Sequence, residues 1–457
     1  MVRVRFAPSP TGKLHVGNAR TAVLNFLLAR NKSGSFIVRI EDTDLERSEV
    51  LFEDAILEDL RWLGMTWDEG PFRQSERISL YREHVDRLQA EGHAYKCFCT
   101  KEELEHARAD ALRRGQPPRY KGTCRSLSES AVAAFERDGK PFVVRLRALE
   151  REISFNDVMH GTVTFPSDHV DDFILLRQDG VPSYNLAAAV DDMAMDITHV
   201  IRGSDHLSNT PKQIMLLLMF GKQPPSYAHH GLLTGPDRKP LSKRYGATSV
   251  AEFRSMGVLP GALVNYLGIM GRSTQHESVA VEDLVAGFSL ESFSGSDSVF
   301  DMDKLLWLNA AHIRALPMER LLSELGLALS YADKVALLRE NGKTLVEVKE
   351  LLDIFDGSNI HVEAFDYLAR IKGLEEAVPV LVETLKKEGK KEFEDIYSSL
   401  EQGTGLARRD LMMLLRIAIT GRKSGPPLKE VFRLTTKQVI LERVACLQTR
   451  FGNLRNV

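Results

Sequence analysis

The sequence predicts a multidomain protein with an α/β part and an all-α part. A parallel-sheet unit comes first, is split by an α+β insertion, and is followed by a helical C-terminal region. The length supports several domains, because 457 residues exceed one ordinary hydrophobic core. Strand and helix patterns alternate over residues 1–96 and again over 190–244, which is typical of a doubly wound sheet. Beyond about residue 310 nearly every pattern is helical.

Composition restricts the class of protein further. Hydrophobic residues make up 43% and charged residues 27%, which is typical of a soluble globular protein. The longest apolar run, Ile214 to Phe220, is too short for a membrane span, and no secretion signal opens the chain. Four cysteines without a secretory context indicate a reducing cytoplasm. A net charge of −3 argues against a globally basic nucleic-acid binder but allows local basic surfaces.

The first 96 residues predict two strand–helix pairs, each identified by its apolar pattern. These are a strand at Val2–Phe6, a helix at Asn18–Arg30, a strand at Phe36–Ile40 and a helix at Ser48–Leu63. In such a sheet, ligands lie beyond the carboxyl ends of the strands. The Pro/Gly loop from Pro8 to Asn18 and the acid Glu41 fall at those ends.

Residues 97–189 interrupt this alternation and predict an insertion. They contain a helix capped by Thr100 with Glu103 and strand patterns at Phe142–Leu146 and Thr162–Phe165. The strand–helix pattern resumes with Ile197–Ile201 and Pro211–Met219.

We expect two helical regions after the α/β part, at 245–310 and 311–457. The first contains a helical pattern from Leu259 to Met270. In the second, one apolar stripe predicts a core helix that ends at Gly421; its members are Leu411, Leu414, Leu415, Ala418 and Ile419.

Two short motifs far apart in the chain predict chemistry on phosphate. His15-Val-Gly-Asn18 stands just before a helix start, whose free N–H groups attract anions. Leu241-Ser-Lys-Arg244 follows a loop rich in Gly and Pro and supplies cations. Each motif is weak alone, since the first also occurs by chance and the second is usually a solvated surface patch. Together and in this order they resemble the nucleotide-binding signatures of class I aminoacyl-tRNA synthetases.

Further motifs narrow the resemblance to bacterial glutamyl-tRNA synthetases over residues 1–310, and more loosely to the C-terminus. The motifs are Arg5-Phe-Ala-Pro-Ser-Pro-Thr-Gly12, Arg39-Ile-Glu-Asp-Thr-Asp44, Leu60-Arg-Trp-Leu-Gly64, Trp67-Asp-Glu-Gly-Pro71, Gln74-Ser-Glu-Arg77 and Val200-Ile-Arg-Gly203. The glutaminyl and the archaeal–eukaryotic glutamyl branches typically show Pro-Pro-Glu-Pro where this chain has Ala7–Pro10. The glutaminyl branch also carries C-terminal β-barrels rather than helices.

The resemblance implies a glutamate–tRNA ligase with a Rossmann-type catalytic domain. ATP and L-glutamate would form glutamyl-adenylate with Mg²⁺ on the phosphates, and the acyl group would pass to tRNA(Glu). The resemblance leaves open whether tRNA(Gln) is also charged. It implies a cytoplasmic monomer without membrane contact. It also divides the chain into catalytic halves at 1–96 and 190–244, an acceptor-binding insertion at 97–189, a stem-contact region at 245–310 and an anticodon-binding region at 311–457.

The residues matching the family's motifs give the expected nucleotide site. Neither reaction step needs a covalent enzyme intermediate, so the site must align reactants and stabilise charge on phosphate oxygens. His15, Lys243 and Arg244 are the catalytic candidates. The ATP-binding candidates are Pro8, Ser9, Gly12, His15, Gly17, Asn18, Asp205, Leu233, Ser242 and Lys243. The family's second loop often begins with Lys, but here Pro240 occupies that position and Lys239 precedes it.

Glutamate carries two carboxylates and one ammonium, so its pocket needs cations and an anion. Arg5 and Arg202 suit bidentate carboxylate recognition, Glu41 suits the ammonium, and the Tyr184 hydroxyl suits the side chain. Ala7 and Ser9 complete the predicted glutamate site. The alternative for each charged residue is a structural ion pair. The motifs leave open which arginine reads the side-chain carboxylate.

Three cysteines in the insertion predict a zinc site. Cys97, Cys99 and Cys124 offer thiolates in a reduced compartment, and Tyr120 is the candidate fourth ligand, with water or none as alternatives. In certain relatives a His stands where this chain has Ser126. Three ordinary reduced cysteines remain the competing interpretation.

Two basic stretches predict contact with RNA, although a charge run is more often a solvated face. The stretch beside the cysteines suits the acceptor end, and its members are Arg113, Arg114, Arg119 and Lys121. The helical region's stretch suits the anticodon arm, and its members are Arg408, Arg409, Arg422 and Lys423.

The rival hypotheses share the fold. One is the truncated enzyme that glutamylates a modified base of tRNA(Asp), but it resembles only the front of this chain. Another is a paralogue specialised toward tRNA(Gln). The third is a catalytically silent tRNA-binding protein, against which the presence of His15 and Lys243 counts.

Overall fold

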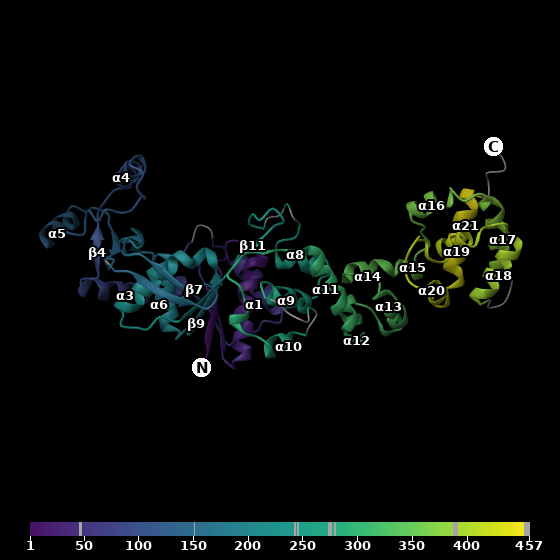
Figure 1. Cartoon of the computed structure of the whole chain (residues 1–457), viewed down its shortest axis with the longest axis horizontal. Helices are drawn as coiled ribbons and strands as arrows, with labels where there is room; N and C mark the ends of the chain where they lie inside the picture. The colour runs from purple at the N-terminus through teal and green to yellow at the C-terminus, as the bar shows by residue number, and fades with distance from the viewer. Residues whose placement is uncertain are drawn as a thin grey trace. The chain divides into compact units, whose positions relative to one another are not determined.

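The structure is a computed structural model that describes residues 1–44, 48–149, 151–241, 244, 246–272, 277, 280–386 and 392–451. It divides into two compact units, one of Met1–Phe253 with Leu263–Asp301 and one of Arg254–Ala262 with Met302–Val457. The predicted α/β and all-α parts are both present (Figure 1). In the described part of the chain, no helix combines the length and the hydropathy that crossing a membrane requires.

The first unit is built on a parallel sheet, as predicted. Its strands are β1 (Arg3–Phe6), β2 (Ser35–Ile40), β3 (Glu69–Arg73), β6 (Ile153–Asp157), β7 (Gly161–Phe165), β9 (His199–Gly203) and β10 (Ser226–His230). β2 pairs in parallel with both β1 and β3, and β10 pairs in parallel with both β9 and β6, while β7 is antiparallel to β6. The N–H of Thr198 donates to the carbonyl of Arg3 at 2.9 Å, which places β9 beside β1.

Two sheets, β3-β2-β1 and β9-β10-β6-β7, thus meet at β1 and β9, and the chain leaves β1 in one direction and returns at β9 on the other side. Such a reversal is the topological switch point where doubly wound sheets bind ligands. β9 starts two residues later than the predicted Ile197, because the N–H of Ile197 donates to the carbonyl of Asp192 at 2.8 Å and closes the preceding helix.

Helices pack on the parallel sheet and position its loops. They are α1 (Val16–Asn31), α2 (Val50–Trp62), α3 (Ile78–Ala90), α6 (Tyr184–Ala194) and α7 (Thr210–Met219), with the 3₁₀ turns η1 (Gln74–Arg77), η2 (Ser167–His169) and η3 (Ser204–Asn209). Val23 and Leu27, two apolar residues of α1, are fully buried. Short elements complete the unit: β11 (Leu233–Thr234), β12 (Ser298–Val299), α10 (Val281–Ala286) and η5 (Leu290–Ser292).

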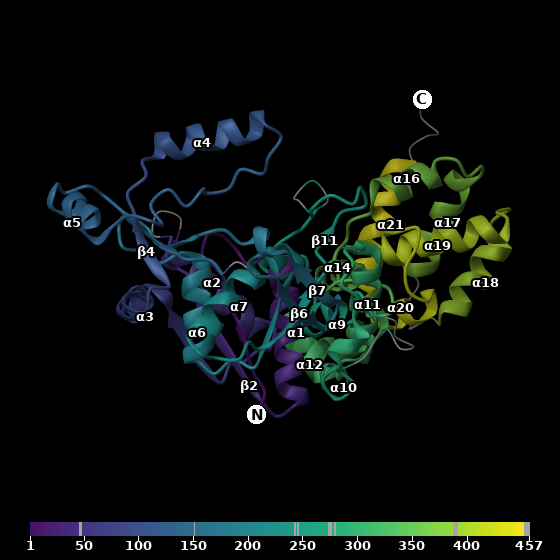
Figure 2. The same ribbon diagram turned by 60° about the vertical axis from the view of Figure 1, so that its left-hand side comes forward.

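A small antiparallel sheet carries the Cys-containing part of the predicted insertion. It is made of β4 (Ala94–Cys97), β5 (Val143–Leu146) and β8 (Ile174–Leu176) in the order β4-β5-β8. α4 (Lys101–Arg113) and α5 (Glu129–Arg137) lie between β4 and β5, and α4 stands apart from the sheets (Figure 2). The capping box predicted from Thr100 and Glu103 is present. β6 and β7 fall in the range predicted for the insertion, yet they extend the parallel sheet.

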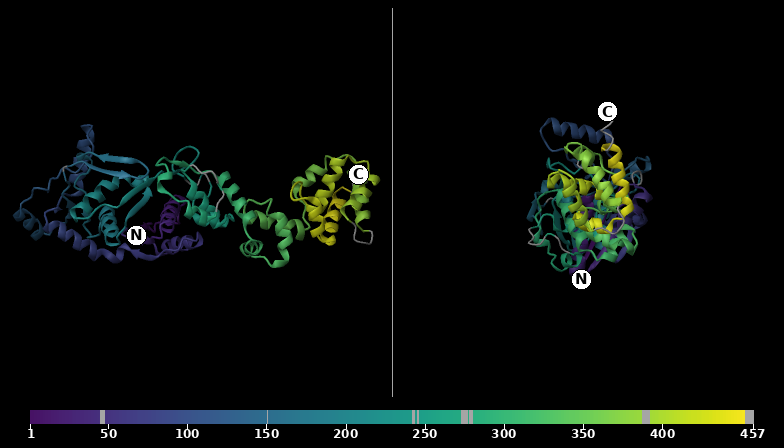
Figure 3. Two further views of the ribbon diagram at one scale, coloured as in Figure 1. Left: turned by 60° about the horizontal axis from the view of Figure 1, so that its bottom comes forward. Right: turned by 90° about the vertical axis from the view of Figure 1, so that its right-hand side faces the viewer.

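Two helices contain a boundary between the units, α8 (Val250–Ser255) and α9 (Pro260–Ile269). The second unit is helical, as predicted, and its last helices gather into one bundle (yellow in Figure 3). Its elements are α11 (Met302–Ala315), α12 (Met318–Leu325), η6 (Leu329–Tyr331), α13 (Ala332–Leu338), α14 (Leu345–Leu351), α15 (Asp353–Asp356), α16 (Val362–Leu368), α17 (Leu374–Lys386), α18 (Phe393–Gly403), α19 (Arg408–Thr420), α20 (Leu428–Leu434) and α21 (Lys437–Phe451).

α19 confirms the helix predicted from its apolar stripe. All five stripe residues are buried in the core of the second unit. The helix ends at Gly421, whose φ of 71° is the left-handed conformation that glycine adopts at low cost.

Candidate active site and candidate metal centre

A cavity of about 430 Å³ opens at the switch point of the parallel sheet. It lies beyond the carboxyl ends of β1, β9 and β10, where the topology predicts a ligand. Many predicted nucleotide and glutamate residues line it: Arg5, Ala7, Pro8, Ser9, His15, Gly17, Asn18, Glu41, Tyr184, Arg202, Asp205 and Leu233. Gly12 and Arg244 do not line it. Ser242 and Lys243 lie outside the described residues.

His15 is the N-cap of α1 and its ring has a defined tautomer. The N–H of Gly17 donates to Nδ1 of His15 at 3.1 Å, so the hydrogen of the neutral ring is on Nε2. Burial lowers the pKa of the His15 imidazole, which favours this neutral form. His15 can therefore donate from Nε2 to an anionic oxygen in the cavity.

Described residues of the second motif and of the segment after it are hydrogen-bonded at the site. At the start of the motif, the N–H of Leu241 donates to the carbonyl of Leu233 at 3.2 Å. After it, Thr248 accepts a hydrogen bond from Val16, directly beside His15. The substituted loop position, Pro240, forms an isolated antiparallel bridge with Thr234, and the preceding Lys239 is exposed.

Arg5 belongs to a buried cluster of charges at the floor of the cavity. Its Nε donates to Oδ1 of Asp192 at 3.1 Å, and Nη1 of Arg39 donates to the same oxygen at 2.7 Å. Nη2 of Arg39 also donates to Glu41 at 3.2 Å. Burial raises the pKa of the Glu41 carboxyl, although Arg39 and Arg5 oppose this shift.

The cluster continues to Asp191, which lies 3.7 Å from Nε of Arg39 and accepts a hydrogen bond from Arg77 at 2.8 Å. The side chains of Gln74 and Tyr81 donate to the other oxygen of Asp191. The three arginines of this cluster (Arg5, Arg39 and Arg77) are thus matched by three carboxylates (Glu41, Asp191 and Asp192).

Arg202 lies at the cavity in a different electrostatic setting. Its side chain is 4% exposed, and it donates to Nε2 of His229 at 3.1 Å and to the Thr210 hydroxyl at 2.8 Å. A third, longer hydrogen bond reaches the Tyr184 hydroxyl at 3.4 Å. Within the described ranges no carboxylate pairs with Arg202, so its positive charge has only neutral hydrogen-bond partners.

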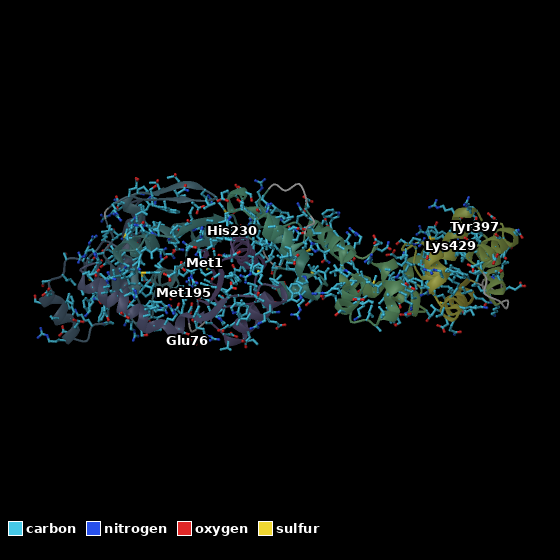
Figure 4. The ribbon with its side chains drawn as sticks, turned by 90° about the horizontal axis from the view of Figure 1, so that it is seen from below. Met1, Glu76, Met195, His230, Tyr397 and Lys429 are labelled. Atoms are coloured by element: carbon cyan, nitrogen blue, oxygen red, sulfur yellow. The ribbon has the colours of Figure 1, made fainter. Side chains whose placement is uncertain are left out.

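Sequence reasoning missed several residues of this site. His206 and His230 line the cavity, and Thr210 holds Arg202. The label in Figure 4 places His230 inside the first unit, where its Nε2 lies 2.8 Å from the Thr21 hydroxyl. Two adjacent histidines directly after Tyr227 and Ala228, His229 and His230, were an available signal for a site at this point of the chain.

The predicted metal ligands come together at the end of β4, where Cys97 and Cys99 meet Tyr120 and Cys124 from the segment after α4. The sulfur atoms of Cys97, Cys99 and Cys124 all lie within 4.8 Å of one another. Cys99 and Cys124 are 3.6 Å apart, and the Tyr120 oxygen is 3.2 Å from Cys97 and 3.7 Å from Cys99. Tetrahedral zinc with ordinary bond lengths separates two sulfurs by about 3.8 Å and a sulfur from an oxygen by about 3.5 Å. The three thiols therefore suit zinc in chemistry, and the Tyr120 oxygen lies at separations that a fourth ligand would have.

The basic residues predicted to contact RNA lie mostly at the surface. Arg113 is the last residue of α4 and Arg114 is its C-cap; both are exposed and share Asp110, at 3.6 and 2.7 Å. Arg119 and Lys121 line a hollow of about 570 Å³ beside the cysteines. In the second unit, Arg408 and Arg409 are exposed at the start of α19. Two others have partners in the chain: Arg422 donates to the carbonyl of Glu350 at 3.1 Å, and Lys423 pairs with Glu363 at 3.0 Å.

Comparison with known proteins identifies the class to which this protein belongs. A family model described as tRNA synthetases class I (E and Q), catalytic domain, matches residues 1–307, and one described as anticodon binding domain matches residues 303–447. The first match covers most of the chain and includes the whole cavity. The protein is an aminoacyl-tRNA ligase with a class I catalytic domain.

Similar proteins of known type identify the family within this class. The glutamate–tRNA ligase of Heliobacterium modesticaldum is 40% identical over 97% of this chain and 96% of its own length. Glutamate–tRNA ligase 2 of Syntrophus aciditrophicus is 40% identical over 99% and 98%. The crystal structure of a glutamate–tRNA ligase from Elizabethkingia meningosepticum, in complex with its amino acid, has a TM-score of 0.86 at 29% identity and covers 98% of this chain and 99% of that one. The chain belongs to the glutamate–tRNA ligase family.

Proposed function

We propose that this protein activates L-glutamate with ATP to glutamyl-adenylate and transfers the glutamyl group to the 3′-terminal ribose of tRNA(Glu), releasing AMP and pyrophosphate. The observation that carries the proposal is the cavity at the switch point. It combines an anion-binding helix start, a donor from His15, two buried arginines and the acid Glu41. An amino acid with two carboxylates and one ammonium, next to a nucleotide, requires this set of charges.

Arg202 takes the side-chain carboxylate of glutamate in this proposal. Arg5 shares Asp192 with Arg39, so much of its charge is compensated, whereas Arg202 has neutral partners. A buried cation without a counter-ion favours an anionic ligand over a neutral amide of the same shape. Glutamate would therefore be preferred over glutamine. Tyr184, which contacts Arg202, adds a hydroxyl at the same place.

On the phosphate side, the start of α1 and Nε2 of His15 stabilise negative charge as the carboxylate attacks the α-phosphate. Ser242, Lys243 and Arg244 supply further donors from the second motif, and the remaining predicted ATP residues shape the adenosine side. Mg²⁺ would enter with ATP and neutralise phosphate charge. Alignment and charge stabilisation suffice, because carboxylate and ribose hydroxyl are themselves the nucleophiles.

The other parts of the chain bind RNA in this proposal. Residues 97–189 hold the acceptor end, 245–310 contact the stem and 311–457 read the anticodon. One zinc ion at the cysteine cluster, with Tyr120 as fourth ligand, would fix the loop that carries Arg119 and Lys121. We further propose that the protein works in the cytoplasm as a monomer.

Charging assays with purified tRNA(Glu) and tRNA(Gln) isoacceptors test the proposal. We expect ATP-dependent esterification of tRNA(Glu) with glutamate, and a much lower rate with glutamine as the amino acid. Efficient charging of tRNA(Gln) alone would assign the chain to the specialised paralogues. Absence of charging and of ATP–pyrophosphate exchange in the presence of both tRNAs would contradict the proposal.

A further inference from the structure

We infer that Asp157 and His229 act as a positioning pair for Arg202, which fixes its guanidinium and leaves its charge available to an anionic amino-acid side chain. The inference rests on the proposed function and deepens it. Neither residue lines the cavity, so neither contacts the substrate. Both act through Arg202.

The pair is buried and closely bonded. Oδ2 of Asp157 lies 2.6 Å from Nδ1 of His229, and both side chains are completely inaccessible to solvent. Asp157 ends β6 and His229 lies on β10, so the pairing of these two strands sets the contact. Main-chain N–H groups of Met159 and His160 also donate to Asp157 and hold its carboxylate in place.

The hydrogen bonds define the tautomer of His229. Nε of Arg202 is a donor only, so Nε2 of His229 must accept at 3.1 Å and carries no hydrogen. The ring hydrogen is therefore on Nδ1 and is donated to Asp157. Burial lowers the pKa of His229, which agrees with a neutral ring. Asp157 thus fixes the one form of the imidazole that can accept from Arg202.

A neutral acceptor has a consequence for specificity. A carboxylate in direct contact with Arg202 would orient it equally well but would also neutralise it, as Asp192 does for Arg5 and Arg39. Here the carboxylate of Asp157 is separated from Arg202 by an imidazole. Two hydrogen bonds hold Arg202 in one orientation, from its Nε to His229 and from its Nη2 to the Thr210 hydroxyl. Each of its two terminal nitrogens still has a hydrogen that it can donate to a ligand.

Substitutions at the pair test this directly. His229→Leu removes the acceptor, His229→Gln offers an amide oxygen in its place, and Asp157→Asn keeps the shape of the carboxylate without its charge. His160→Leu is the matched control, because His160 contacts the main chain of His229 at 2.9 Å but not Arg202. Thermal melting of each variant shows whether it is folded, and charging of tRNA(Glu) gives KM and kcat for glutamate, glutamine and ATP.

For His229→Leu we expect the KM for glutamate to rise about tenfold or more, since a hydrogen bond to a charged group is lost, with the KM for ATP unchanged. The preference for glutamate over glutamine should fall by a similar factor. His229→Gln should restore most of the glutamate affinity and most of the preference for glutamate over glutamine. In Asp157→Asn both quantities should lie between those of His229→Leu and the parent protein. His160→Leu should match the parent protein.

The inference is overturned if folded His229→Leu keeps the parent's KM for glutamate and its preference. It is also overturned if the KM values for glutamate and ATP rise together, which indicates a general structural role. If His229→Leu does not fold, the same test is applied to His229→Gln and Asp157→Asn. A rise in the KM for glutamate relative to the KM for ATP in Asp157→Asn then supports the inference, and an equal rise in both overturns it. Failure of the parent protein to charge tRNA with glutamate would instead contradict the proposed function.

Discussion

The main-chain N–H of Val16 donates to the carbonyl of Thr248 at 2.8 Å and ties the start of α1 to the segment that follows the Leu241–Arg244 motif. A second bond runs from Val250 to the carbonyl of Leu14 at 3.0 Å. The start of α1 and the segment Thr248–Val250, more than two hundred residues apart in the sequence, are thereby held next to each other.

His15 caps α1 through Nδ1 and can donate to an anionic oxygen through Nε2, and two substitutions separate these roles. Asn in its place can still accept from the N–H of Gly17 but lacks the Nε2 donor, whereas Gln can donate at the Nε2 position. We expect His15→Asn to lower the kcat of ATP–pyrophosphate exchange with tRNA present by about 100-fold, as for the loss of one transition-state donor, and His15→Gln to lower it clearly less. A larger loss in His15→Gln than in His15→Asn would show that capping of α1 matters more than donation.

Lys243 lies outside the described residues, and its catalytic role is predicted from the motif alone. We expect Lys243→Ala to reduce the activation rate on the order of 100-fold with little change in the KM for glutamate, because its charge should act mainly in the transition state. The exposed neighbour Lys239 gives the matched control, and Lys239→Ala should have a much smaller effect. Near-normal turnover with only a raised KM for glutamate would contradict the role.

The raised pKa of the buried Glu41 carboxyl predicts how glutamate binding depends on pH. Burial raises the pKa of this carboxyl above the ordinary value for Glu, so its anionic form is lost earlier as the pH falls. We expect kcat/KM for glutamate to decline on the acid side, where protonated Glu41 no longer attracts the ammonium. Glu41→Gln should have a raised KM at all pH values and lack this decline. Glu76→Gln, a change at an exposed residue, should keep the parent's profile.

Periodicity in the sequence predicted the main elements well where one residue pattern decides them. The stripe of α19 and the capping box of α4 are examples, because local spacing specifies both. The motifs predicted Arg5, His15, Glu41 and Arg202 together, since strand ends of a parallel sheet meet at one edge. Pairing between distant strands leaves no such local signal. The place of β6 beside β10, and with it the contact of Asp157 with His229, could not be read from the chain.

The cysteine cluster predicts about one zinc ion per purified chain. Cys97→Ser with Cys99→Ser should abolish binding and lower the melting temperature, because a structural zinc site contributes to folding. Cys446 is exposed on α21, far along the chain from the cluster, and Cys446→Ser should change neither quantity. Metal analysis of protein prepared without chelator measures the first effect and calorimetry the second. Zinc-free protein with the parent's stability would contradict the assignment.

The start of α19 predicts where the second unit contacts RNA. Arg408 and Arg409 are exposed there, while Lys423 already pairs with Glu363, so removal of the first two charges should weaken RNA binding more. We expect Arg408→Ala with Arg409→Ala to raise the KM for tRNA several-fold and leave kcat and the KM for ATP unchanged.

The salt dependence of the KM for tRNA tests the phosphate contacts of Arg408 and Arg409 more directly than the KM itself. Each lost phosphate contact should lower the slope of log KM against log salt by about 0.7, so two contacts predict a decrease of about 1.4. Arg422→Ala with Lys423→Ala should change the slope less. Lys429→Ala with Glu394→Gln removes an exposed ion pair of the same unit (Figure 4 labels Lys429) and is the charge-neutral control. If the Arg408 and Arg409 variant keeps the parent's salt slope, the RNA surface of this unit lies elsewhere.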